Sequence, residues 1–477
     1  MTESTAAPEA VALAAGFPEH DLADWRALAA GVVNRRRPES EQLTPEEAEA
    51  SLRVSIDGGV TLDPLYMRPQ PLLDPGMPGA MPFTRGRTLR DVTLAWDVRA
   101  LHDDPDVALT RAAVLDDLEH GVTSVWLHLG DDGLAPDDLA EALADVRLDL
   151  APVVVSSTTD QQGAANALLA ALGDGSVGGN LGLDPVGAAG RLGTTADLSH
   201  LADAVRSCSD REGLLAIAVD TRALHDAGAD DIDEIAFAVT TGLSYLRHLE
   251  AEGIPPAEAF QSIEFRVSAT ADQFLTAARL RALRRVWARV GEVSGVAVAD
   301  RAARTHAVTS LRMASREDPW VNVLRGTLAA FGASLGGADA ITVLPYDTVW
   351  GLPERLSRRL ARNTQILLAD EANVGRVTDP AGGSWYLESL TDDVARSVWA
   401  TVQDLERAGG MLEALRSGSV HSRIQQAASA RDKDLATRRR ELTGVSTFPI
   451  LDQPALVRRP RAALPTRDGG LPPHRDA

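Results

Sequence analysis

The sequence predicts an α/β protein built on a (β/α)8 barrel, and two observations carry this prediction. Short apolar runs of strand length recur along the middle of the chain, and stretches with helical periodicity separate them. Such alternation is typical of a parallel sheet, and eight units over about 250 residues fit the size of a closed barrel. The eight candidate strands cover residues 92–96, 122–129, 150–155, 180–183, 214–219, 263–267, 307–311 and 340–344. A doubly wound open sheet is the alternative, since the strand pattern is weakest at 180–183 and 307–311.

Helical periodicity is clearest in two of the segments between these strands. Apolar residues recur there at a spacing that places them on one face of a helix. The first stripe consists of Ile232, Ile235, Val239, Leu243 and Leu246, and the second of Leu275, Ala278, Ala282, Val286 and Val290. We therefore predict a helix over each segment.

Residues 312–390 combine one β/α unit with an unusually specific loop. A helix is expected to begin after Asp318-Pro319 and to end at Gly336-Gly337, because glycine readily adopts the left-handed conformation of a helix cap. The strand at 340–344 follows. A second helix then carries Arg358, Arg359 and Arg362 and leads to the turn Asp379-Pro380-Ala381-Gly382-Gly383.

The two ends of the chain differ from this middle part. Residues 1–90 are predicted to form an arm that faces a partner or the main domain, because helical patterns at 25–33 and 45–52 are followed by a proline-rich run at 64–82 that cannot build a core. The barrel is assigned to 91–390. A helical extension opening at Thr391 is expected over 391–445, and the Pro- and Arg-rich residues 446–477 are read as a linker or disordered tail.

Charge and cysteine content exclude several classes of protein. The formal net charge of −21 argues against a nucleic acid or an anionic membrane as partner. Cys208 is the single cysteine, so we expect a buried, inert thiol and a reducing compartment. No apolar run reaches the roughly 20 residues of a membrane span, and the N-terminus lacks the basic region of a signal peptide. These observations predict a soluble, cytoplasmic protein.

Three local motifs point to chemistry only weakly. Residues 173–178 match G-x-G-x-x-G, but a helix precedes them and a strand follows, which reverses the order of a dinucleotide loop. Residues 332–336 match G-x-S-x-G at the end of a helix rather than at a nucleophile elbow. His225 follows the fifth predicted strand, on the catalytic face of a barrel, where Asp226 could orient it; a hydrogen-bonded loop histidine is the alternative. The scattered histidines predict no metal site.

Several longer motifs resemble the methylmalonyl-CoA mutase family. They are PFTRG at 82–86, WDVR at 96–99, RLRALRRVW at 279–287, DPWVNVLR at 318–325, SRRLARNTQ at 357–365 and DPAGGS at 379–384, and the resemblance covers residues 20–450. It implies a (β/α)8 barrel threaded by the CoA tail of the substrate, with a separate C-terminal domain that presents adenosylcobalamin. The implied reaction is a radical rearrangement between methylmalonyl-CoA and succinyl-CoA.

Departures from the family pattern decide which kind of member is expected. Leu101 stands where catalytic chains have an active-site tyrosine, Asp103 replaces a glycine, and Ala223 stands where they have a histidine. The cobalamin domain and its D-x-H-x-x-G motif are missing from this sequence. Leucine and alanine cannot hydrogen-bond a radical intermediate. The resemblance therefore implies a small, non-catalytic subunit that binds no cofactor itself and stabilises a homologous large subunit carrying adenosylcobalamin.

Five residues are candidates for a vestigial pocket, namely Arg85, Arg99, His225, Asn363 and Gln365. Arg85 and Arg99 could engage the phosphates of an acyl-CoA that is bound without being converted, or serve as structural ion-pair residues. The alternative function is a barrel-only acyl-CoA mutase chain that works with a separate cobalamin-binding protein.

Overall fold

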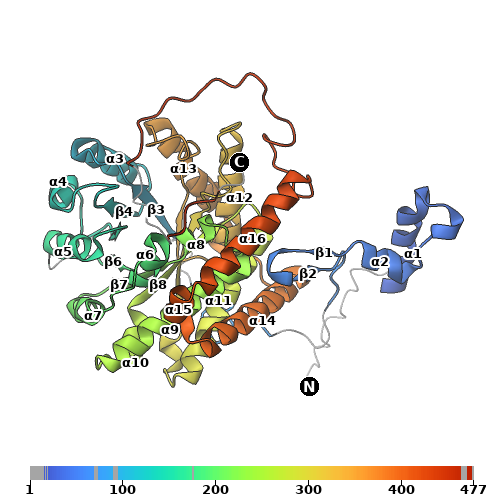
Figure 1. Cartoon of the computed structure of the whole chain (residues 1–477), viewed down its shortest axis with the longest axis horizontal. Helices are drawn as coiled ribbons and strands as arrows, with labels where there is room; N and C mark the ends of the chain where they lie inside the picture. The colour runs from blue at the N-terminus through green and yellow to red at the C-terminus, as the bar shows by residue number, and fades with distance from the viewer. Residues whose placement is uncertain are drawn as a thin grey trace, which may run out of the picture. The chain divides into compact units, whose positions relative to one another are not determined.

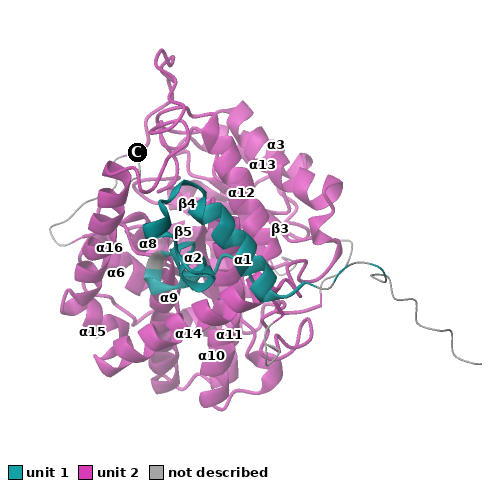
Figure 2. Ribbon diagram, turned by 90° about the vertical axis from the view of Figure 1, so that its right-hand side faces the viewer, with its two compact units in different colours: residues 1–66 teal, residues 67–477 magenta. Residues whose placement is uncertain are grey.

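The computed structural model describes residues 16, 18, 20–68, 74–89, 95–173, 177–462 and 470–474. The chain divides into two compact units, residues 1–66 and 67–477 (Figure 2). The first unit contains helix α1 (Leu22–Val33), helix α2 (Pro45–Ser51) and a short hairpin of β1 (Val54–Ser55) and β2 (Thr61–Leu62). Both helices begin at a capping box, formed by Asp21 and by Thr44, as the helical patterns predicted.

The second unit is a closed barrel of eight parallel strands surrounded by helices (Figure 1). The strands are β3 (Asp97–His102), β4 (Ser124–Leu129), β5 (Val153–Ser157), β6 (Gly179–Leu183), β7 (Leu214–Asp220), β8 (Ile263–Ala269), β9 (Arg304–Thr309) and β10 (Ala340–Thr342). They pair in the order β10-β3-β4-β5-β6-β7-β8-β9, and the ring closes between β9 and β10. The predicted barrel is confirmed, and the open sheet is excluded.

The first barrel strand lies further along the chain than predicted. It was expected at 92–96, of which 92–94 lie outside the described residues, but the strand begins at Asp97. Two of its inward side chains, Asp97 and Arg99, are charged: Arg99 donates to Asp97 Oδ2 at 2.8 Å and to Glu264 Oε1 on β8 at 3.0 Å. Because these charges neutralise one another inside the barrel, the strand needs no apolar run, and a search for such runs missed it.

Helices cover the outer face of the sheet. The long ones are α3 (Val107–Glu119), α5 (Gln161–Ala171), α9 (Asp231–Ala251), α11 (Gln273–Val293), α12 (Val321–Leu335) and α13 (Arg355–Ile366). The short ones are α4 (Leu139–Ala142), α6 (Pro185–Leu192), α7 (Leu201–Cys208), α8 (Arg222–Asp226) and α10 (Pro256–Gln261). The predicted helices at 232–246 and 275–290 are α9 and α11. Helix α12 ends as predicted, with Gly337 at φ +75°.

Three arginines of α11 are buried, each with compensating partners. Arg279 donates to Asp231 Oδ1 at 2.5 Å, and Arg281 donates to both oxygens of Glu388 at 2.8 Å. Arg284 donates to backbone carbonyls, including that of Phe83 at 3.0 Å. These contacts explain the arginine-rich motif at 279–287 as a device that ties α11 to α9, to α14 and to the segment that precedes the barrel.

The C-terminal extension consists of α14 (Trp385–Arg407), α15 (Gly410–Arg416) and α16 (Ser419–Ala436). The prediction that a helix opens at Thr391 was wrong, because α14 already begins after Ser384, whose hydroxyl accepts from the Leu387 N–H. Asp392 is no cap residue: it pairs with Arg285 at 2.8 Å and with Arg396 at 2.6 Å. Asp392 therefore lies inside α14 and serves as an ion-pair partner for one arginine of the same helix and one of α11.

Two properties of the whole chain are visible in this fold. Cys208 is buried at the end of α7, and burial raises the pKa of its thiol to about 12, which makes it unreactive as predicted. Among the described residues, no helix combines the length and the apolarity that crossing a membrane requires.

Candidate functional site

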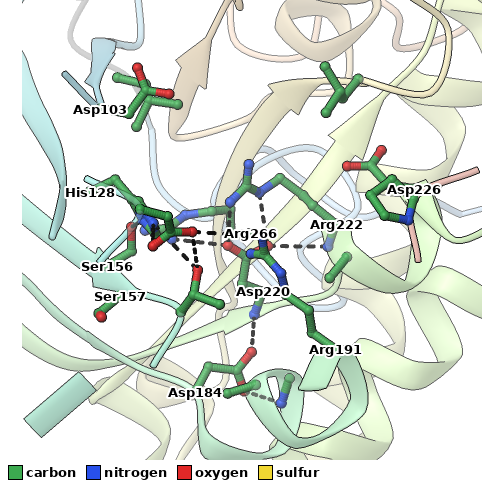
Figure 3. A pocket seen from close by; sticks show the side chains of 18 of the residues that line it. Asp103, His128, Ser156, Ser157, Asp184, Arg191, Asp220, Arg222, Asp226 and Arg266 are labelled. Atoms are coloured by element: carbon green, nitrogen blue, oxygen red, sulfur yellow. Dashed lines mark hydrogen bonds and ion pairs between the residues drawn. The ribbon is translucent and has the colours of Figure 1, made fainter. Parts of the chain in front are cut away.

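A cavity of about 390 Å³ lies at the carboxyl ends of the barrel strands (Figure 3). This is the end of a (β/α)8 barrel where the loops that follow the strands gather. Its charged and hydrogen-bonding wall is formed by Asp103, His128, Asp132, Ser156, Thr158, Asp184, Arg191, Asp220, Arg222, Asp226, Arg266 and Arg461. Its apolar wall includes Leu101, Trp126, Ala223 and Leu344.

The floor of the cavity is a stack of charged groups on Trp126. The guanidinium carbons of Arg222 and Arg266 lie 4.6 and 4.1 Å from the centroid of the indole ring. Asp220 holds both arginines: it accepts two bonds from Arg222, at 2.9 and 2.6 Å, and one from Arg266 at 3.2 Å. Burial opposes ionisation of Asp220, but the two guanidinium groups outweigh it and hold the pKa at about 2. The carboxylate is therefore ionised at neutral pH.

Side chains of this stack cross the barrel axis. Trp126 lies on β4 and Arg266 on β8, which are not neighbours in the sheet. Behind them, His306 of β9 accepts a hydrogen bond from Arg266 Nε at 3.1 Å and packs edge-on against the indole at 5.4 Å. Arg99 and Glu264 pair across the same interior. The barrel axis below the cavity is filled by these packed side chains.

A second polar cluster lies on the β4–β5 side. His128 Nδ1 is 3.0 Å from Ser156 Oγ, and its Nε2 is 2.8 Å from Asp132 Oδ1. Thr158 donates to the other oxygen of Asp132 at 2.9 Å. Burial works against ionisation of Asp132, but the contacts with His128 and Thr158 lower its pKa below the usual value. Both ring nitrogens of His128 are thus engaged.

Asp184 has the opposite electrostatic setting. It follows β6. Its carboxyl oxygens accept a hydrogen bond from the hydroxyl group of the buried Tyr245 and one from the backbone N–H of Asp220 at 2.9 Å. Burial raises the pKa of Asp184 to about 7, and these hydrogen bonds only partly offset that effect. The cavity therefore holds one acid that titrates near neutral pH beside one that stays ionised.

Leu101 and Ala223, at the positions where the resemblance implies a catalytic tyrosine and histidine, both line the cavity. Leu101 ends the inward side of β3, and Ala223 lies on the short helix α8 that follows β7. Neither side chain can donate or accept a hydrogen bond.

None of the five candidate pocket residues lines this cavity. Arg85 pairs with Asp379 of the 379–383 turn at 2.9 Å, and Arg99 lies deeper in the barrel. Gln365 of α13 is buried and accepts from Trp96 Nε1 at 3.1 Å, whereas its neighbour Asn363 is half-buried. Arg85 and Arg99 are ion-pair residues, the alternative considered for them above.

His225 is a buried structural histidine rather than a group of the cavity. His225 lies two positions after Ala223 on helix α8. On a helix, this offset turns the side chain by roughly 200° about the helix axis, away from the direction of Ala223. Its Nε2 is 2.8 Å from Ser310 Oγ and its Nδ1 is 3.1 Å from Glu234. Glu234 therefore orients it, and Asp226 does not. His225 is hydrogen-bonded, as the alternative expected, but it lies on a short helix rather than in a loop.

The residues that build the cavity do not belong to any of the short motifs in the sequence, so those motifs could not identify them. A usable signal was present: polar side chains occur where the strands end, at Ser156 after β5's apolar run and at Asp220 and Arg222 after β7. Arg266 stands in the middle of the apolar run at 263–267. A charged residue inside such a run is itself a sign of a polar barrel interior.

Among the described residues, one cluster has the residue types and spacing of a metal site, and an arginine already compensates its charge. His225, Asp231 and Glu234 lie close enough to hold an ion, with ligand atoms within 4.8 Å of one another. However, Arg279 donates to both carboxylates and already supplies the cation there. The cavity histidine His128 has no ring nitrogen to spare.

The fold and the cavity define a (β/α)8 barrel protein with a ligand-type cavity at the carboxyl end of its strands. A profile described as methylmalonyl-CoA mutase matches residues 194–461. The chain is 46% identical over 472 residues, 97% of this chain and 76% of the relative, to the methylmalonyl-CoA mutase small subunit of Streptomyces virginiae. It is 45% identical, over 98% of this chain and 75% of the relative, to the small subunit of Propionibacterium freudenreichii subsp. shermanii.

Similarity extends more weakly to the methylmalonyl-CoA mutase of Escherichia coli (strain K12), which is 33% identical over 52% of this chain and 35% of the relative. The chain belongs to the methylmalonyl-CoA mutase family, as its motifs indicated.

Proposed function

We propose that this chain is the small subunit of an adenosylcobalamin-dependent methylmalonyl-CoA mutase and is itself non-catalytic. In this role it pairs with a homologous large subunit, which binds the cofactor and interconverts methylmalonyl-CoA and succinyl-CoA. The similarity to relatives described as small subunits, over nearly the whole chain, supports this assignment.

One observation carries the non-catalytic part of the proposal. A radical rearrangement needs hydrogen-bonding groups held against the substrate in a dry site. At the two wall positions concerned, the chain presents Leu101 and Ala223 to the cavity.

The barrel interior supports the same conclusion. A CoA tail that threads the barrel needs an open axis. Here Trp126, Arg266 and His306 pack across the axis, and Arg99 pairs with Glu264 beneath them. Opening this axis would separate buried ion pairs, which is costly because each charge would lose its partner away from water.

The domain roles follow from this proposal. Residues 1–90 form the partner-facing arm, 91–390 the barrel, 391–445 a helical extension and 446–477 a linker or tail. The interface with the large subunit is of obligate size, on the order of 2,000 Å² or more. A cytoplasmic location belongs to the same proposal, supported by the buried, unpaired Cys208.

The experiment is reconstitution with and without the large subunit. This chain and the large subunit are purified separately and together, and mutase turnover is measured with adenosylcobalamin present. We expect co-elution, turnover only when the large subunit is present, and a lower thermal midpoint for the large subunit alone. Turnover by this chain alone would contradict the proposal. So would a large subunit that is equally active and stable by itself and does not co-elute.

A further inference from the structure

Two short stretches near the C-terminal end of the sequence line the cavity. Arg461, Ala462, Leu471 and Pro473 all line it. We define the strap as residues 458–462 and 470–474. Both parts lack helix and strand, in keeping with the absence of periodicity in their sequence.

The strap is anchored on opposite sides of the barrel. Its first part contacts loops that follow β3 and β10: Arg459 pairs with Asp104, Arg461 pairs with Asp103, and Arg458 donates to Asp347 at 2.5 Å. β3 and β10 are neighbours in the ring.

The second part of the strap contacts the side of β6 and β7. The Leu471 N–H donates to the Arg191 carbonyl at 3.1 Å, and the His474 N–H donates to the Asp226 carbonyl at 2.5 Å. Arg191 ends the helix that follows β6, and Asp226 ends the helix that follows β7. Since β6 and β7 lie across the ring from β3 and β10, the two parts of the strap lie on opposite sides of the mouth.

Charge rather than apolar burial holds most of this segment. The Arg459 and Arg461 side chains are 50% and 31% exposed although both are ion-paired. Leu451 and Val457, which lead into the strap, are 90% and 82% exposed, and Leu471 is the strap's buried apolar residue. A segment with few buried apolar contacts opens at a lower free energy than the core does. Ion pairs at the protein surface also weaken as salt is added.

We propose that the strap is a gate, which restricts access to the barrel cavity while its arginines are paired and admits larger molecules when they are released. The gate is a property of this chain and does not depend on the partner proposed above. Its anchoring carboxylates, Asp103 and Asp104, follow directly from the strand that carries Leu101, so its release would uncover the cavity wall itself.

The test uses a reporter thiol inside the cavity of the full-length protein. Ala223→Cys places a thiol on the cavity wall, and the native Cys208 is buried and unreactive. The rate of labelling by a fluorescein maleimide is compared between A223C alone and A223C with R459Q and R461Q. We expect the second protein to label about tenfold faster, because local opening governs access to the thiol. We also expect 1 M salt to raise the rate of A223C alone, since the Debye length falls to about 3 Å.

The matched control removes two arginines from exposed helical ion pairs. Arg407 pairs with Asp404 on α14, and Arg416 pairs with Glu413 on α15. In each pair the residues are three positions apart, and none of them lines the cavity. A223C with R407Q and R416Q should label at the rate of A223C alone. Equal labelling rates in the strap and control variants would overturn the proposal.

A second measurement guards against an effect of the cysteine or of misfolding. Hydrogen exchange of the Leu471 and His474 amides, which donate to the Arg191 and Asp226 carbonyls on the β6–β7 side, is followed in R459Q/R461Q without the reporter. Faster exchange confined to these amides supports the gate. Unchanged exchange there, or faster exchange throughout the barrel, contradicts it.

Discussion

Asp220 is the residue whose removal should disturb the barrel interior most directly. Asp220→Asn keeps the shape of the side chain but removes the charge that compensates Arg222 and Arg266. Relative to the ordinary value of 3.8, the pKa of about 2 corresponds to roughly 2 kcal/mol of preference for the ionised form in the folded state. Arg266 is only 1% exposed, so its charge cannot turn to water when Asp220 is lost. We expect D220N to lower the free energy of unfolding at pH 7 by about 2–4 kcal/mol.

The pH dependence of this loss gives the prediction its sign. A carboxyl group with a lowered folded-state pKa stabilises the protein fully above its unfolded-state pKa, and this stabilisation disappears as the pH falls through the folded-state pKa. For Asp220 the window runs from about pH 5 down to about pH 2. With the same two pKa values, the charge-dependent part of the difference between native protein and D220N should shrink to roughly half of its pH 7 value by pH 3.

Urea unfolding followed by circular dichroism at pH 7, 5, 4 and 3 measures this difference. Asp404→Asn is the matched control, because Asp404 pairs with Arg407 on a helix surface where the two side chains are 63% and 70% exposed. That variant should lose about 0.5 kcal/mol or less. The reasoning about a buried charge cluster is refuted if D220N is no more destabilised than D404N, or if its deficit is the same at pH 7 and pH 3.

Three other perturbations test the site and the fold. Asp184→Asn should become steadily more stable relative to the native chain as pH rises from 4 to 7. Burial raises the pKa of Asp184 to about 7, so over this range the unfolded native chain loses the proton while the folded chain keeps it; thermal midpoints across the range check the prediction. Glu388→Gln should lose about 3 kcal/mol, since it leaves the fully buried Arg281 with only the more distant carboxylate of Asp379 at 3.5 Å, and a urea midpoint no lower than that of E413Q would contradict this. Leu101→Tyr with Ala223→His should restore no mutase turnover to this chain with adenosylcobalamin, because the barrel axis stays filled; measurable turnover would show that the two side chains alone had been missing.

Patterns that depend on nearby residues were predicted well. The helices α9 and α11 follow from a periodic stripe, α12 ends at the glycine pair, and the turn at 379–383 forms with Asp379 at φ +56° and Gly383 at φ +85°. Each depends on contacts within one or two turns of the chain or on the conformational freedom of one residue. The family motifs extended this to the whole barrel, which the closed ring of strands confirms.

The predictions failed where a charge was compensated from far away. The charged residues Asp97 and Arg99 gave no sign of a buried strand, because the carboxylate of Glu264 that compensates Arg99 lies 165 residues further along the chain. The helix opening expected at Thr391 lies inside α14, where the next residue, Asp392, pairs with Arg285 of another helix. The cavity is missed for the same reason, because its polar residues come from the ends of several strands.

The sequence by itself determined the class of fold, the family and the two wall positions, Leu101 and Ala223, that have no hydrogen-bonding group. These are properties of residue order and of side-chain chemistry, and they hold before the chain folds. Only the tertiary structure decided that the barrel axis is filled by Trp126, Arg222 and Arg266, and that residues 461–462 and 471–473 line the cavity. Closing a parallel barrel joins strands and loops that are hundreds of residues apart, so the pairing of buried charges is settled by the ring as a whole.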